Sequence, residues 1–299
     1  MARFQDLPAE LGAAIIKQAD TPQDVSAMIR ADPWLLHCFL SNRKQVMMPQ
    51  VAKIMEVCGG HVTTGYLLAA QLHHAKQDPV FNDPRSSSQH RERIVGPILR
   101  PCIHSPYTHR RVSHRASLGT ICVLSTLAID IGWLTTSYTS QVREQLSRYH
   151  RRPEELPEIS TEMHLRFVNV ACRFESYVQA FVHAGYPLFP RCLTLRSLLF
   201  SPFICSAERE ENVTRTFYSI AYYIYDQHCT MMKNIMSSLG VNEACLVGGR
   251  TQDRRIFRLQ NCKQIEVNKY VHYLTTQGLV CAMDIREYLG QLVPQHSHG

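Results

Sequence analysis

Four potential metal ligands lie close together near the middle of the chain, with the spacing C-x-H-x4-H-x4-H: Cys102, His104, His109 and His114. Thiolate and imidazole are the ligands that zinc prefers, and four of them in one loop could close a tetrahedral shell. The same segment carries four arginines, whose charge would oppose a dication: Arg100, Arg110, Arg111 and Arg115. The spacing also matches no usual zinc module, so we predict a solvated basic loop, no metal ligand and no cofactor.

A thiol beside an imidazole is the minimum for a nucleophilic site, and Cys58 and His61 flank the pair Gly59-Gly60. No Asn or Asp is placed to orient the imidazole, and Cys58 falls on the apolar side of a predicted helix. We therefore predict that Cys58 is a buried, inert thiol. The adjacent pairs His73-His74 and His228-Cys229 point about 100° apart on a helix, so neither pair is expected to chelate an ion.

The chain contains no sequence motif of a known catalytic site. G-x-S-x-G, H-E-x-x-H, the P-loop and G-x-G-x-x-G are all absent, and the turn at Gly248-Gly249-Arg250 lacks the Lys-Ser/Thr of a phosphate cradle. We therefore predict a protein that is not an enzyme. The alternative is an enzyme whose site is assembled from residues far apart in the sequence, around the segment 102–114.

Five aromatic residues cover two faces of one predicted helix: Phe217, Tyr218, Tyr222, Tyr223 and Tyr225. A helix of this kind is typical of the centre of a helical bundle. Any tyrosine left exposed would provide a recognition surface, because the ring offers rigid contact area with a polar tip.

The composition of the 299 residues is that of a soluble protein, with 45% hydrophobic and 19% charged residues. The longest apolar run, residues 118–134, is interrupted by Asp130, so we predict a buried helix and no membrane span. Eleven scattered cysteines without a C-x-x-C pair and an N-terminus without a secretory signal favour the cytoplasm or nucleus. The net charge of +7 is too diffuse to indicate a nucleic-acid partner.

The first forty-odd residues predict three short helices with separate start signals. Asp6, Thr21 and Asp32 are the expected N-caps, and a proline in each opening turn costs little because its missing N–H would be unpaired there. Asp24 completes a capping box with Thr21. Apolar side chains recur at helical spacing and should pack on each other or on a partner: Leu7, Leu11, Ile15, Ala19, Val25, Met28, Ile29, Trp34, Leu35, Phe39 and Leu40.

The opening Leu7-Pro8-x-Glu10-Leu11 and the link Asp20-Thr21-Pro22-x-Asp24 resemble the start of fungal F-box-like proteins. The segment from Ala27 to Pro33 is similar to a phrase common in those chains. The resemblance implies a binding module that docks on the Skp-type adaptor of a cullin-RING ubiquitin ligase, while the rest of the chain holds an unknown protein substrate. The residues expected to face the adaptor or to form the core of this element are Leu7, Pro8, Leu11, Ile15, Val25, Ile29 and Trp34. A degenerate box in a helical scaffold without a ligase role is the alternative.

Beyond this element, helical periodicity continues and no clear strand alternation appears, so we predict an all-α fold. Residues 1–76 should form the F-box-like region, with further helices at 43–58 and 62–76. Turn-forming residues predict an irregular linker or loop over 77–112. Residues 113–299 should form a larger, irregular helical domain, with helices beginning near residue 113, at 137–151, at 160–185, at 207–239, at 253–273 and near the C-terminus.

Overall fold

The computed structural model describes residues 7–58, 60, 62–83, 86–104, 116–149, 160–183, 186–189, 193–200, 210–238, 269, 271–275 and 277–279. Across these residues the chain forms ten helices and one short hairpin, which confirms the predicted all-α class. The elements are α1 (Ala9–Lys17), α2 (Pro22–Ala31), α3 (Pro33–Val57), α4 (Thr64–Lys76), α5 (Pro79–Asn82), α6 (Ser88–His104), α7 (Leu118–Tyr149), α8 (Thr161–Phe181), β1 (Val182–His183), β2 (Tyr186–Pro187), α9 (Leu193–Phe200) and α10 (Glu210–Ser238).

The predicted N-caps at Thr21 and Asp32 are confirmed, whereas the N-cap of α1 is Pro8 and not Asp6. Ser160 caps α8 in the same way as Thr21 and Asp32 cap their helices. The Thr21 hydroxyl accepts from the Asp24 N–H at 3.2 Å, and the Asp24 carboxylate accepts from the Thr21 N–H at 3.0 Å, which completes the capping box. The Asp32 carboxylate accepts the Trp34 N–H at 2.7 Å, and the Ser160 hydroxyl accepts the Met163 N–H at 3.2 Å. Local capping chemistry therefore sets the starts of α2, α3 and α8.

Helix α3 joins two of the predicted helices across a kink. The non-helical residue is Asn42 (φ −121°, ψ 21°), whose side-chain amide donates to the Cys38 carbonyl at 3.2 Å. The kink lies next to the predicted break before residue 43. At the far end, Gly60 has φ +88° and its N–H bonds the Met55 carbonyl at 2.7 Å, so the helix stops where the glycine pair predicts.

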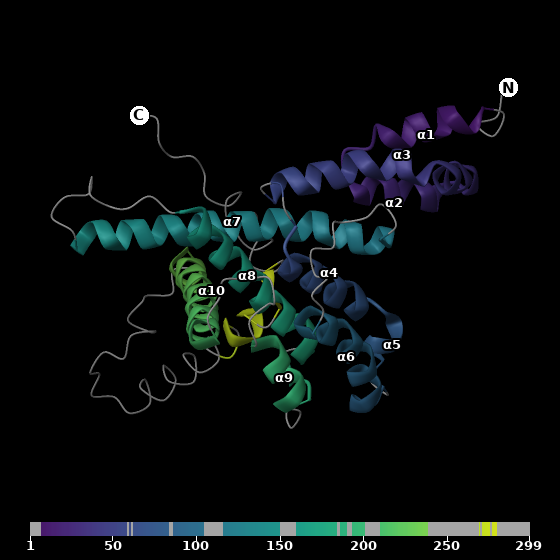
Figure 1. Ribbon diagram of the computed structural model, residues 1–299. Coiled ribbons are helices and arrows are strands. Elements are labelled where there is room, and N and C mark those ends of the chain that lie inside the picture. Colours follow the sequence, from purple (N-terminus) through teal and green to yellow (C-terminus); the bar gives the residue numbers. More distant parts are fainter. Residues whose placement is uncertain are drawn as a thin grey trace, which may run out of the picture.

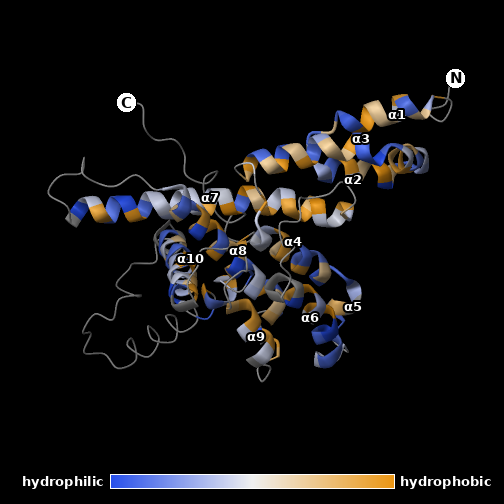
Figure 2. Cartoon of the chain, viewed as in Figure 1, coloured by the Kyte–Doolittle hydropathy of each residue, from blue (hydrophilic) through white to orange (hydrophobic). Residues whose placement is uncertain are grey.

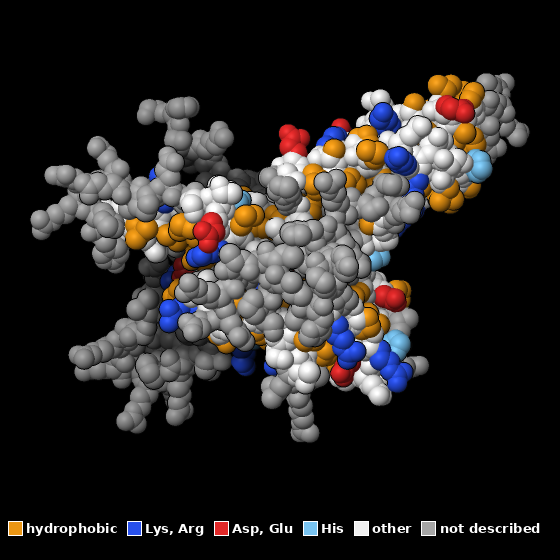
Figure 3. Space-filling view, in the orientation of Figure 1, with side chains coloured by type: hydrophobic (Ala, Val, Ile, Leu, Met, Phe, Trp, Pro, Cys, Tyr) orange, Lys and Arg blue, Asp and Glu red, His pale blue; other side chains and the backbone are white. Residues whose placement is uncertain are grey.

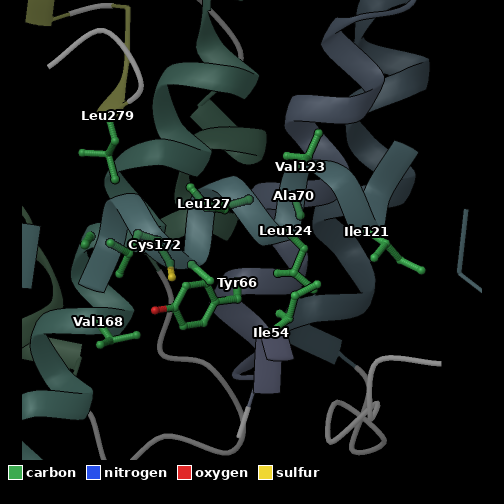
Figure 4. Packing of buried hydrophobic residues seen from close by; sticks show 14 of the residues in the cluster. Ile54, Tyr66, Ala70, Ile121, Val123, Leu124, Leu127, Val168, Cys172 and Leu279 are labelled. Carbon is green, nitrogen blue, oxygen red and sulfur yellow. The ribbon is translucent and has the colours of Figure 1, made fainter. Parts of the chain in front are cut away.

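The main hydrophobic core draws on α1, α2, α3, α4, α7, α8 and α10 together. Figure 4 shows Tyr66 of α4 near its centre, with Cys172 and Val168 of α8 on one side and Leu124 and Leu127 of α7 on another. Helix α4 packs on both α7 and α8. The predicted boundary near residue 77 therefore does not divide the core.

The segment 77–112 was predicted to be an irregular linker, and this is wrong for most of its described part, which contains α5 and α6. A second apolar cluster holds these helices against α4, α8 and α9, with Val95 and Leu99 of α6 fully buried in it. The Arg91 side chain also donates to the Phe81 carbonyl at 3.0 Å and to the Asp83 carbonyl at 2.9 Å, which fixes the turn between α5 and α6. Tertiary packing thus stabilises a helix that its prolines and serines disfavour locally.

Helix α7 is one continuous element where two helices were predicted, and it crosses the whole molecule (Figure 1). Its N-terminal half is mostly apolar and its far end polar (Figure 2). By length and composition alone α7 is apolar enough to cross a membrane, the only such helix in the described part of the chain. The apolar face of its N-terminal half is packed in the main core, where Ile121, Leu124 and Ile131 are fully buried.

One further predicted helix ends earlier in the structure than expected. Helix α8 stops at Phe181 and does not continue to residue 185, because the chain turns into the antiparallel hairpin of β1 and β2. Most of the helix predicted over 253–273, and the last predicted helix, lie outside the described residues. The described helical residues 271–275 lead to Gly278 and Leu279, and Leu279 packs in the main core.

Candidate partner-binding face

Helix α1 packs on α3 along one of its faces. Gly12, Ala13 and Ile16 are buried there. A Cβ at Gly12 would lie 2.5 Å from the Cys38 Sγ and 2.7 Å from the Trp34 Cη2, so the missing side chain lets α3 approach the α1 backbone closely. The packed face of α1 therefore combines a close backbone approach at Gly12 with the fully buried side chain of Ile16.

Three large aliphatic side chains on and just before α1 are exposed. Leu7, Leu11 and Ile15 follow one another at four-residue spacing, with exposed fractions of 37%, 50% and 36%. We name these three residues the α1 stripe. They lie outside the contact with α3, which Gly12, Ala13 and Ile16 fill, so they are not among the core-forming residues of this element. Pro8 is exposed as well and precedes the first helical residue as the N-cap.

The other three predicted site residues belong to the core side of this region. Val25 of α2 is fully buried, and Ile29 and Trp34 are partly buried against the main core. The structure therefore divides the seven predicted residues into an exposed group on and before α1 and an inward group on α2 and α3. The inward group positions α1, because Trp34 is one of the side chains that meet Gly12.

A second exposed apolar pair lies on the first half of α3. Leu36 is 39% exposed and Leu40 is 61% exposed. At 100° per residue they point more than about 120° away from Trp34 and Cys38, the residues that meet α1. They therefore form a separate patch from the α1 stripe. Figure 3 shows apolar side chains gathered at this end of the molecule, where α1 and the start of α3 lie.

Cys58 is half-buried, where a buried thiol was predicted, and its environment makes the thiol a poor nucleophile. Burial raises the pKa of Cys58 to about 11, although the Tyr66 hydroxyl, its hydrogen-bond partner, opposes that rise. Cys172 lies nearby on α8, and burial raises the pKa of its thiol as well. The other half of the predicted Cys58–His61 pair lies outside the described residues.

The fold buries His228 and partly buries His73. Burial lowers the pKa of His73, and the nearby Glu175 carboxylate opposes that shift. Burial lowers the pKa of His228 to about 4. The His228 Nδ1 lies 3.2 Å from the Thr275 Oγ1, whose proton is donated to the Val271 carbonyl, so Nδ1 carries the imidazole proton. Within the described ranges no three His, Cys, Asp or Glu side chains gather as ligands.

The predicted metal-like segment is only partly described. The backbone of Cys102 and His104 belongs to the end of α6, whereas their side chains, His109 and His114 lie outside the described residues. The predicted turn at Gly248-Gly249-Arg250 lies entirely outside the described residues.

The aromatic set of α10 is divided between the core and the surface. Phe217 and Tyr223 are buried, and Tyr223 packs edge-on against Tyr138 of α7 with ring centroids 5.0 Å apart. Tyr218 and Tyr222 are 65% and 71% exposed. The expected core position thus applies to Phe217 and Tyr223, and the expected exposed aromatic surface applies to Tyr218 and Tyr222.

No protein-family model, curated protein or solved structure matches this chain.

Proposed function

We propose that this chain is a protein-binding subunit that docks another protein on the α1 stripe and needs no bond-making residue for its role. The observation that carries this is a helix apolar on two sides: Gly12, Ala13 and Ile16 are buried on α3, while Leu7, Leu11 and Ile15 remain at the surface. A row of large aliphatic residues at helical spacing on an exposed helix suits a groove on a partner.

The partner we propose is the Skp-type adaptor of a cullin-RING ubiquitin ligase, because the same residues carry the resemblance to F-box-like proteins. In this proposal the N-terminal helices bind the adaptor and the larger helical remainder holds a protein substrate, in the cytoplasm or nucleus. The exposed Tyr218 and Tyr222 of α10 are the described residues best suited to that second contact.

The free energy that the α1 stripe can contribute to binding follows from the apolar area that its side chains expose to water. Leu11 is half exposed, so burying the rest of its side chain in a groove would contribute about 1 kcal/mol. Leu7 and Ile15 are each about a third exposed and would add somewhat less. An aspartate at position 11 would lose the free energy that burial of the leucine side chain contributes. Its carboxylate would also have to give up bound water on entering the groove, so we expect binding to weaken by about 30-fold or more.

The test is the affinity of the full chain for the purified adaptor, measured by calorimetry for the wild type, for Leu11→Asp and for Leu146→Asp. Leu146 is the matched control, because it is 40% exposed on α7, far along the chain from the stripe. We expect Leu11→Asp to weaken binding by about 30-fold or more and Leu146→Asp to leave it unchanged, with circular dichroism unaltered in both. Failure of the well-folded wild type to bind the adaptor would refute the ligase role and favour the scaffold alternative.

A further inference from the structure

A groove of about 410 Å³ lies between α2, α4 and α7, away from the α1 stripe. Its walls are single helix faces: Gln23, Ser26, Ala27 and Arg30 from α2, and Gly119, Cys122, Val123, Thr126 and Leu127 from α7. His73 and Gln77 at the end of α4 close one side. A volume of this size is typical of small-molecule sites.

The groove is kept open by contacts that fix its walls. The Gln23 amide donates to the Cys122 carbonyl at 2.9 Å and to the Thr126 hydroxyl at 2.8 Å, which holds α2 on α7 at one point along the groove. At the other wall, the missing side chain of Gly119 leaves room for the His74 ring, since a Cβ there would lie 2.5 Å from its Cε1. The groove is thus bounded on both sides by specific contacts.

The chemistry of the lining is one cation above an apolar floor. Val123 and Leu127 are buried at the floor, and no Asp or Glu lines the groove. Arg30 is exposed and lies close enough to Cys122 to oppose the rise that burial causes in the pKa of that thiol. Among the described residues no carboxylate forms an ion pair with Arg30.

The remaining polar groups of the groove are uncharged at neutral pH. Burial lowers the pKa of His73, so its imidazole is neutral there, and Gln77 places an amide beside it. Ser26 adds a hydroxyl on the same face of α2 as Arg30. A single guanidinium with neutral hydrogen-bonding groups fits one carboxylate, which it can bind with two parallel hydrogen bonds.

We infer that this groove binds a small organic carboxylate, with the carboxylate on Arg30 and an apolar body over Val123 and Leu127. The site does not depend on the partner at the α1 stripe, so the two proposals fail separately. A ligand here would contact α2 and α7 together and would strengthen the attachment of α2 to the long helix.

The test uses 4-phenylbutanoate as the probe and 4-phenylbutanamide as its uncharged analogue. Binding to the full chain is followed through the methyl NMR signals of Val123 and Leu127, up to about 10 mM, because small ligands of this size bind weakly. We expect saturable shifts of both residues with the acid, and binding at least about tenfold weaker with the amide or in Arg30→Gln. Arg143→Gln, an exposed arginine elsewhere on α7, is the control and should bind the acid as the wild type does.

Three results would overturn the inference: no saturable shift of Val123 and Leu127, equal affinity for acid and amide, or unchanged affinity in Arg30→Gln. Tighter binding of phenyl phosphate than of 4-phenylbutanoate would overturn the carboxylate assignment. Ala27→Phe provides a second check, because a ring added at this exposed position of the groove should compete with the probe while leaving the core intact.

Discussion

Replacing Gly12 with alanine tests how α1 is seated on α3. The added Cβ would lie 2.5 Å from the Cys38 Sγ, 2.7 Å from the Trp34 Cη2 and 3.0 Å from the Cys38 Cβ. Contacts this short force α1 away from α3 or move both side chains, and overpacking of this kind costs about 1–3 kcal/mol. Alanine also gains about 1 kcal/mol in helix propensity over glycine, so the net effect should be a destabilisation of up to about 2 kcal/mol.

Gly132→Ala in α7 is the matched control for this prediction. No atom lies within 4 Å of the position that its Cβ would take, so alanine there should stabilise the helix by about 1 kcal/mol through propensity alone. The two variants make the same chemical change inside a helix. The difference between their free energies of unfolding, about 1–3 kcal/mol, therefore isolates the cost of crowding at the contact between α1 and α3.

The assay is urea unfolding of both variants, together with hydrogen exchange of the α1 amides. We expect Gly12→Ala to lower the unfolding midpoint and to speed exchange in α1 first. Cys38→Ala removes the closest atom, so in a double-mutant cycle it should recover about 1 kcal/mol of the loss. Equal effects of alanine at positions 12 and 132, or no coupling to position 38, would refute the close approach.

Three other predictions follow from buried polar groups. Since the His228 pKa is about 4 in the folded chain and about 6.5 in the unfolded chain, the unfolded chain takes up the proton first, and stability should fall by at most about 3 kcal/mol as the pH drops through that interval. His228→Gln should remove that part of the pH dependence in urea titrations, and an unchanged slope would contradict it. Glu175→Gln places an amide where a buried carboxylate accepts from the Leu279 N–H at 2.8 Å and from the Gln179 amide at 2.5 Å, so it should cost about 1–3 kcal/mol and speed hydrogen exchange at residue 279. Cys58, with a pKa of about 11, should react with iodoacetamide at pH 7.5 at least about tenfold more slowly than glutathione does, as read by site-resolved mass spectrometry; equal rates would disprove the raised pKa.

The sequence predicts the elements of this fold that depend on local chemistry. Thr21 with Asp24, Asp32 with Pro33, and Ser160 are capping groups whose partners lie within three residues, so the starts of α2, α3 and α8 could be found without knowledge of packing. The break at Asn42 is local as well, since its side chain bonds a carbonyl one turn back. The end of α3 at the glycine pair after Cys58 is also set by local sequence.

Features that depend on tertiary contacts were missed or misplaced. Helix α6 contains Pro97 and Pro101 and follows a serine run, and it is stabilised by Val95 and Leu99 in the second core, which periodicity alone does not show. On α1, periodicity finds the apolar residues but not the side that faces α3. There Gly12 and Ala13 lie beside Ile16 in the interface, because the close approach of the two helices at Gly12 decides which side of α1 is buried.

The candidate site could be predicted only as a set of residues. The sequence groups Leu7, Leu11 and Ile15 with Val25, Ile29 and Trp34, since all are apolar at helical spacing, and only the packing of α1 on α3 separates surface from core. The carboxylate groove was missed entirely. Its residues come from three helices, and the spacing of Gln23, Ala27 and Arg30 on α2 is unremarkable without α7 opposite.

The length of α7 sets a fixed separation between the two ends of the molecule. Near its start, Cys122 and Thr126 hold Gln23 of α2, and further along, Gln141 accepts from the Gln227 amide of α10 at 3.3 Å. From residue 122 to residue 141 the helix rises about 28 Å. Between these two contacts α7 is also held in the main core through Leu127, Ile131 and Leu134. The helix therefore acts as a spacer: a protein bound at the N-terminal helices and one bound on α10 would be kept at a constant distance and angle.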